Sequence, residues 1–297
     1  MAIYGTIEGG GTKFVCAVGS APDALKDIVT FPTTTPAETL DEVITFLAGH
    51  GPLDAIGIAM FGPLDLNLAS VGYGSMLATP KPGWCGAAIV SPLRETFGVP
   101  IGFDTDVNGA ALGEGRWGAG RDLETFMYIT VGTGIGGGGV IAGNPMHGLI
   151  HPEIGHLRIP RHPEDPYEGG CPFHGDCLEG LASGPALAER WGRSAEDLGT
   201  DTDGAVALEA HALGHAMANL VLTVSPERII LGGGVMKLPG LLDATRERML
   251  VSLGGYVDTP LLGDRAEHFL VAPELGDRSG IAGGLVLAEN AHSGSNR

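Results

Sequence analysis

The chain has 297 residues, 43 % of them apolar, which is long enough for two lobes that each bury a core. Its 17 Lys and Arg against 35 Asp and Glu give a formal net charge of −18, which disfavours nucleic acid and anionic membranes as partners. No uncharged apolar run reaches the roughly 18 residues of a membrane span, and the N-terminus is not typical of a secretion signal. We therefore expect a cytoplasmic protein.

The 50 glycines gather in loops, where a backbone can approach a ligand closely. The first loop lies between the apolar residues 2–7 and 14–18 and predicts a hairpin turn whose N–H groups form an anion site. The G-x4-G-K-[ST] spacing of a Walker A loop is absent, and an ordinary hairpin turn is the alternative. The loop consists of Gly9, Gly10, Gly11, Thr12 and Lys13.

An α/β pattern follows the first loop. A capping box at residues 35–38 predicts a helix over 36–47, and residues 56–60 read as a buried strand. A further strand over 99–103 runs into Asp104 and Asp106, and residues 110–114 turn helical. Polar residues at the carboxyl end of a strand occupy the usual place of an α/β active site, so Asp106 suits a catalytic carboxylate. The alternative is that Asp104 or Asp106 only caps the helix.

The second glycine loop covers residues 130–139, after the strand-like residues 126–129. A threonine between glycines offers a hydroxyl and unobstructed amides, so Thr133 and Gly134 suit a second phosphate contact. The alternative is a flexible hairpin.

Four soft ligands occur within 22 residues of one another and predict a tetrahedral zinc site. The alternative is a disulfide between Cys171 and Cys177, which a reducing compartment disfavours. Cys16 and Cys85 stand apart in apolar surroundings and read as ordinary buried thiols. The four predicted ligands are His156, Cys171, His174 and Cys177.

Two glutamates flank this metal loop. A bound zinc ion would also hold Glu153 and Glu179, which makes them candidate acceptors for the hydroxyls of a polyol. The alternative is that both are solvated loop charges.

The third glycine loop follows a buried strand pattern at residues 228–231 and precedes a helix over 241–253. Strand, glycine turn and helix together mark a nucleotide site in open α/β sheets, although the G-x-G-x-x-G spacing of a dinucleotide fold is absent. Residues 205–224 also read as a helix. Three such loops indicate one ligand held from several directions.

Together these motifs resemble the ROK family of bacterial sugar kinases, and within it the fructokinases. The resemblance follows the chain in order over nearly its whole length, and the metal cluster is its most specific part. Glu8 and Thr105, where the broader family often has aspartate and asparagine, look characteristic of the fructokinase branch. The stretches that carry the resemblance are 8–13, 61–65, 79–84, 104–108, 130–139 and 153–177.

The resemblance implies an α/β, two-lobed actin/hexokinase-like (ribonuclease H-like) fold with a zinc-binding loop. We expect lobes at 1–117 and 118–297, with a last helix at 279–292 that packs back on the N-terminal lobe, and a homodimer. The implied reaction is the phosphorylation of fructose by ATP, with Mg²⁺ as cofactor and a structural Zn²⁺.

The resemblance also implies roles for single residues. Asp106 would be the catalytic base, and the metal ligands would be the four named above. Sugar contacts would come from Thr105, Asp106, Glu153 and Glu179. Nucleotide contacts would come from Gly9, Gly10, Gly11, Thr12, Lys13, Thr133, Gly134, Pro185, Gly232, Gly233, Gly234, Val235 and Met236.

Two other functions compete with this interpretation. A ROK kinase for another hexose, such as mannose or glucose, would carry the same motifs. An actin-like ATP-binding chaperone or sensor would share the fold but lack an ordered sugar site.

Overall fold

The computed structural model describes residues 2–198 and 202–294, which belong to two compact units. Unit 1 comprises Met1–Asp122, Gly138–Pro152 and Leu275–Arg297, and unit 2 comprises Leu123–Gly137 and Glu153–Glu274. One five-stranded sheet lies in unit 1, and a second lies mainly in unit 2.

The sheet of unit 1 has the strand order β3-β2-β1-β4-β5. The first two strands form the predicted antiparallel hairpin around the first glycine loop, and β4 and β5 run parallel to β1. The strands are β1 Tyr4–Gly9, β2 Lys13–Gly19, β3 Lys26–Pro32, β4 Ala55–Met60 and β5 Ile101–Thr105. The strand predicted at 99–103 therefore exists but is shifted by two residues.

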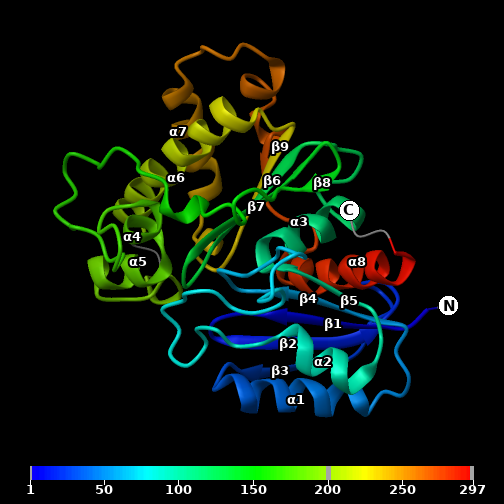
Figure 1. The fold of residues 1–297 in the computed structure, drawn as a ribbon. Coiled ribbons are helices and arrows are strands. Elements are labelled where there is room, and N and C mark those ends of the chain that lie inside the picture. The colour runs from blue at the N-terminus through cyan, green and yellow to red at the C-terminus, as the bar shows by residue number, and fades with distance from the viewer. Residues whose placement is uncertain (1, 199–201, 295–297) are drawn as a thin grey trace. The chain divides into compact units, whose positions relative to one another are not determined.

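Helices cover both faces of this sheet (Figure 1). The predicted capping box is confirmed, because Thr35 and Glu38 exchange hydrogen bonds at the start of α1. On the other face α8 lies against β4 so closely that a Cβ on Gly57 would overlap the backbone at Gly284. The helices of unit 1 are α1 Pro36–Ala48, α2 Val90–Phe97, α3 Asp106–Trp117 and α8 Ser279–Ser293.

The sequence indicates that the glycines gather in loops, but several of them lie in strands and helices. Gly57 and Gly102 lie in strands, where each allows the backbone of α8 to approach closely. Gly109 and Gly284 lie in helices, where a Cβ would overlap the side chains of Ala59 and Thr6. Such close packing of helix on sheet is a structural use of glycine and involves no ligand.

Trp84 is fully buried in unit 1, where it packs on Phe14 and donates from Nε1 to the carbonyl of Thr34 at 2.9 Å. Its neighbour Cys85 is exposed, so the prediction of a buried thiol is correct for Cys16 and wrong for Cys85. The reason is that Trp84 occupies the core position of this loop and turns the next side chain toward solvent.

The second sheet has the order β10-β9-β6-β7-β8. Its strands are β6 Phe126–Val131, β7 Ile135–Ile141, β8 Asn144–Pro145, β9 Arg228–Gly232 and β10 Leu270–Val271. The second glycine loop is thus shorter than predicted, because Gly136, Gly137, Gly138 and Gly139 belong to a regular strand.

The helices of unit 2 confirm the predicted segments, and α7 has the predicted bounds. They are α4 Leu178–Ala182, α5 Gly184–Trp191, α6 Asp203–Val224 and α7 Leu241–Leu253, with short 3-10 turns η1 Ile154–His156 and η3 Val235–Lys237. Helix α6 is long and apolar enough to cross a membrane, but 67 % of its most apolar window is buried. It is a core helix of unit 2.

Candidate functional site

Three parallel strands of unit 1 end at one edge of their sheet. The register places Gly9 of β1 opposite Met60 of β4, and Met60 opposite Thr105 of β5. Neighbouring strands are about 4.8 Å apart, so the first glycine turn and the start of α3 lie roughly 10 Å apart at this edge. The sheet therefore brings Asp106 and the predicted phosphate turn to the same side of unit 1.

Asp106 is the first residue of α3 and is partly buried. The cap of the helix is Thr105, whose Oγ1 accepts from the N–H of Asn108 at 3.1 Å. The alternative in which Asp104 or Asp106 caps the helix is therefore wrong. Asp106 Oδ1 accepts from the N–H of Val107 at 2.9 Å, a contact that fixes the rotamer of its carboxylate.

The carboxylate of Asp104 binds two polar side chains close to Asp106 in the chain fold. The sequence did not indicate this group. Asp104 is buried, and its oxygens accept from Asn108 Nδ2 and from His147 Nε2, both at 2.9 Å. The hydrogen bond to Asp104 raises the pKa of His147. His147 lies 43 residues away in the sequence, so no local spacing could have indicated the pair.

Burial also affects Glu8, which precedes the first glycine turn. Its carboxyl group lies against Gly280 of α8. Burial raises the pKa of Glu8 to about 7, although Lys13 opposes the shift.

The second and third glycine turns meet in unit 2. Strands β6 and β9 are parallel, with Thr130 opposite Gly232, so both turns leave the same edge of the sheet. Gly233 has φ +100°, and a Cβ there would overlap Val131. The amide of Gly184 donates to the carbonyl of Gly132 at 2.7 Å and places the first turn of α5, with Pro185, beside them.

The predicted nucleotide residues therefore form two groups. Gly9 to Lys13 form the turn in unit 1, and the others gather at one sheet edge of unit 2. Adjacent backbone N–H groups at such turns bind phosphate oxygens.

The four predicted metal ligands come together, with all donor atoms within 4.8 Å of one another. Cys171 Sγ lies 3.8 Å from His156 Nδ1 and 3.7 Å from His174 Nδ1, and Cys177 Sγ lies 3.5 Å from His156 Nδ1. Tetrahedral zinc bonds separate such donors by roughly 3.4 to 3.8 Å. Both thiols are free, so the disulfide alternative is wrong and the donor set fits zinc.

Glu179 connects this cluster to the second glycine turn. Its Oε2 accepts from the N–H of Ile135 at 2.9 Å, and a Cβ on Gly134 would lie 2.7 Å from the same oxygen. Glu179 is thus no solvated loop charge. Glu153 is exposed, yet desolvation and, secondly, the charge of Glu179 raise the pKa of its carboxyl.

A buried hydrogen-bond network around Arg190 holds the segment that leads into the metal cluster. Arg190 of α5 donates to Asp165 at 3.0 Å and to Glu209 of α6 at 3.3 Å, and its guanidinium stacks on Tyr167. Glu209 is fully buried, and its Oε2 accepts no hydrogen bond from residues 2–198 or 202–294. Burial raises the pKa of Glu209 to about 8, although Arg190 opposes the shift.

This shift predicts a pH dependence of stability. The folded protein keeps the proton on Glu209 up to about pH 8, whereas the unfolded chain releases it near the ordinary pKa of about 4.3, so stability falls as the pH rises between these values. Glu209→Gln mimics the protonated acid and removes this loss. At pH 8.5 the variant is expected to melt at least about 2 °C above the parent in differential scanning fluorimetry, a gap that shrinks by pH 5.

The exposed Glu189 of α5 provides a control, because Glu189→Gln removes a carboxylate near Arg190 while the amide oxygen can still accept from Tyr167. A difference in melting temperature between Glu209→Gln and the parent that does not grow with pH would contradict the assignment.

Known proteins are similar to this chain in both sequence and fold. The chain matches the ROK family over residues 4–291. A fructokinase of Zymomonas mobilis is 44 % identical over 293 residues, 96 % of each chain, and a fructokinase of Pediococcus pentosaceus is 41 % identical over 97 % of this chain and 98 % of its own. The solved structure of a ROK family glucokinase from Streptomyces griseus with glucose and AMPPNP is 25 % identical, covers 97 % of this chain and 99 % of its own, and has a TM-score of 0.76.

Proposed function

Because the chain belongs to the ROK family, we propose that it transfers the γ-phosphoryl group of ATP to fructose and forms fructose 6-phosphate. The observation that carries this proposal is the similarity to fructokinases at 41 % and 44 % identity over nearly full length. The glucokinase of Streptomyces griseus is more distant, at 25 %.

The glycine turns would hold the phosphates of ATP through their backbone N–H groups. Thr12 and Lys13 would add a hydroxyl and a positive charge in unit 1, and Thr133 would add a hydroxyl in unit 2. Magnesium would neutralise part of the phosphate charge. It prefers oxygen ligands, and Glu8 and Asp106 carry carboxylates of the type that it binds.

Asp106 would accept the proton of the attacking sugar hydroxyl. Its place at the carboxyl end of β5 supports this role. The N–H of Val107 fixes the rotamer of its carboxylate, and Asp104 fixes the side chain of the nearby Asn108. Thr105, Glu153 and Glu179 would contact sugar hydroxyls, because their oxygens lie at the sheet edge or beside the metal cluster.

The zinc ion would be structural, since four protein ligands close its coordination sphere and leave no position for substrate. Free thiols at all four cysteines support a reducing, cytoplasmic location. A homodimer is also proposed, and light scattering coupled to gel filtration tests it.

The choice of sugar gives the main test of this function. Fructose is expected to be phosphorylated with a kcat/KM at least about tenfold above that for glucose or mannose, a difference of roughly 1.4 kcal/mol. A coupled assay of ADP release across hexoses measures it. A preference for glucose or mannose would overturn the fructokinase assignment and leave a hexose kinase, and ATP turnover unaffected by sugar would favour a chaperone or sensor.

Glu153→Gln is expected to raise the KM for fructose far more than the KM for ATP and to reduce the preference for fructose. The reason is that glutamine has only one oxygen that can accept from a sugar hydroxyl, whereas the carboxylate of glutamate has two. Glu164→Gln serves as control, because this exposed glutamate lies in the same loop and its carboxylate forms no hydrogen bond or ion pair with residues 2–198 or 202–294. An increase in the KM for ATP alone would contradict the placement.

A further inference from the structure

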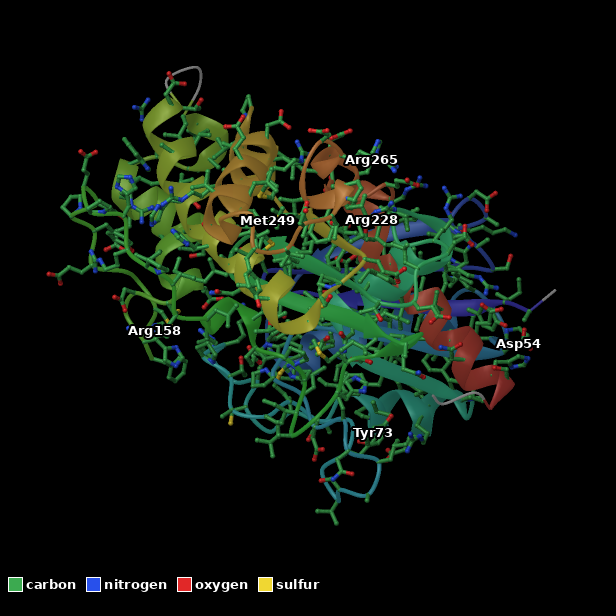
Figure 2. All side chains as sticks on the ribbon, turned by 90° about the horizontal axis from the view of Figure 1, so that it is seen from above. Asp54, Tyr73, Arg158, Arg228, Met249 and Arg265 are labelled. Carbon is green, nitrogen blue, oxygen red and sulfur yellow. The ribbon has the colours of Figure 1, made fainter. Side chains whose placement is uncertain are left out.

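A cluster of basic side chains in unit 2 has no role in the proposed reaction. It lies where α6, α7 and the loop after η1 meet, around an open cavity of about 280 Å³. His162, His211, Glu247 and Arg248 line the cavity together with small apolar side chains. The two helices run side by side in Figure 1, and the buried Met249, next to Arg248, is labelled in Figure 2.

Hydrogen bonds fix both histidines of α6 in the neutral form. His211 donates from Nε2 to the carbonyl of Pro160 at 3.0 Å, so its Nδ1 accepts from Arg248 at 2.8 Å. His215 donates from Nδ1 to Ser252, so its Nε2 accepts from Arg248 at 3.2 Å. Both bonds use the same guanidinium nitrogen, which has only two hydrogens to give.

The other donors of Arg248 have no acceptor among residues 2–198 and 202–294. Three of its five N–H groups make no hydrogen bond to a described residue, and one of them, on Nε, is buried. No carboxylate of the described chain lies within ion-pair distance of Arg248. The lining carboxylate Glu247 is exposed and forms no ion pair with it. Arg248 therefore has no direct ion-pair partner among the described residues.

His162, on the loop after η1, adds a further donor to the lining. Its Nδ1 accepts from the N–H of Glu164 at 3.3 Å, which places the remaining ring proton on Nε2. Its ring meets the ring of His211 edge-on at 4.9 Å, and both line the cavity. Donors on a loop and on a helix thus line one small cavity.

We propose that this cavity binds a phosphate group, carried either by free inorganic phosphate or by a phosphomonoester. A guanidinium with unused N–H groups matches phosphate oxygens, and the several oxygens of one phosphate group can accept from α7 and from the loop at once. The small volume suits a single phosphate or a sugar phosphate.

The test uses the full-length, zinc-loaded protein with a non-hydrolysable ATP analogue that fills the nucleotide site. Inorganic phosphate is titrated while the imidazole NMR signals of His162 and His211 are followed. Saturable shifts with a Kd of about 1 mM or lower are expected. Shifts that do not saturate below about 20 mM would overturn the proposal.

Charge variants identify the cavity. Arg248→Gln is expected to weaken phosphate binding at least about tenfold, and Glu247→Gln to strengthen it at least about twofold. Arg265→Gln, which removes an equal charge from the same unit outside the cavity, is the control and should leave the Kd unchanged (Figure 2). Equal weakening by both arginine variants would overturn the proposal.

A second variant covers the case in which Arg248→Gln does not fold, and a comparison of ligands identifies the source of the phosphate. If Arg248→Gln unfolds, His162→Gln, on the loop, is expected to weaken phosphate binding at least about threefold without altering the contact of α6 with α7. Fructose 6-phosphate that binds at least about tenfold tighter than inorganic phosphate identifies a phosphomonoester, and equal binding identifies the free ion. Citrate that shifts the imidazole signals of His162 and His211 and is not displaced by phosphate would overturn the phosphate assignment.

Discussion

Asp106→Asn is expected to lower kcat at least about a hundredfold while the fold and ATP binding stay nearly intact. Asparagine is isosteric with aspartate but cannot take the proton of a sugar hydroxyl. Its amide oxygen can still accept from the N–H of Val107, so the start of α3 should not change. Steady-state kinetics with fructose and a binding titration with an ATP analogue separate the loss of chemistry from a loss of binding.

Asp41→Asn on α1 is the matched control, because this exposed aspartate in the same unit lies on a different helix. Its kcat should equal that of the parent. A folded Asp106→Asn protein with near-normal turnover would mean that another group accepts the proton.

Local signals predicted several elements well. The capping box at Thr35 and Glu38 set the start of α1, and glycines fixed the hairpin between β1 and β2 and the bounds of α7. In each case the residues that determine the backbone lie within a few positions of one another. Such features need no knowledge of the fold.

Contacts between distant segments were not predictable in the same way. Gly57 and Gly284 meet although 227 residues separate them in the chain, so no local pattern indicated their contact. The exposure of Cys85 depends on the burial of Trp84, and β7 is a strand because it pairs within a sheet. Burial and pairing arise only when the chain is folded.

The candidate site shows the same division. The spacing of two cysteines and two histidines predicted the metal cluster, because all four ligands occur within 22 residues. The hydrogen bond of Glu179 to Ile135 and the pairing of Asp104 with His147 link segments 44 and 43 residues apart and could not be derived from spacing. These longer contacts connect the metal loop to the glycine turn and stiffen the surroundings of Asp106.

Removal of zinc is expected to act through folding. Cys177 is fully buried, and Cys177→Ser should lower the melting temperature by at least about 5 °C, since the free energy of metal binding is here part of the free energy of folding. A chelator should have the same effect on the parent. Both treatments should make the segment 156–177 sensitive to protease, because the ligands close the turns of that loop.

Cys85→Ser is the matched control, since Cys85 is exposed and lies outside the cluster. It should retain one zinc per chain in elemental analysis and the melting temperature of the parent. Zinc absent from protein purified without chelator would refute the metal assignment. If Cys177→Ser instead kept its melting temperature and lost only kcat, the zinc would act on the chemical step, and a four-ligand site with no open position could not explain that result.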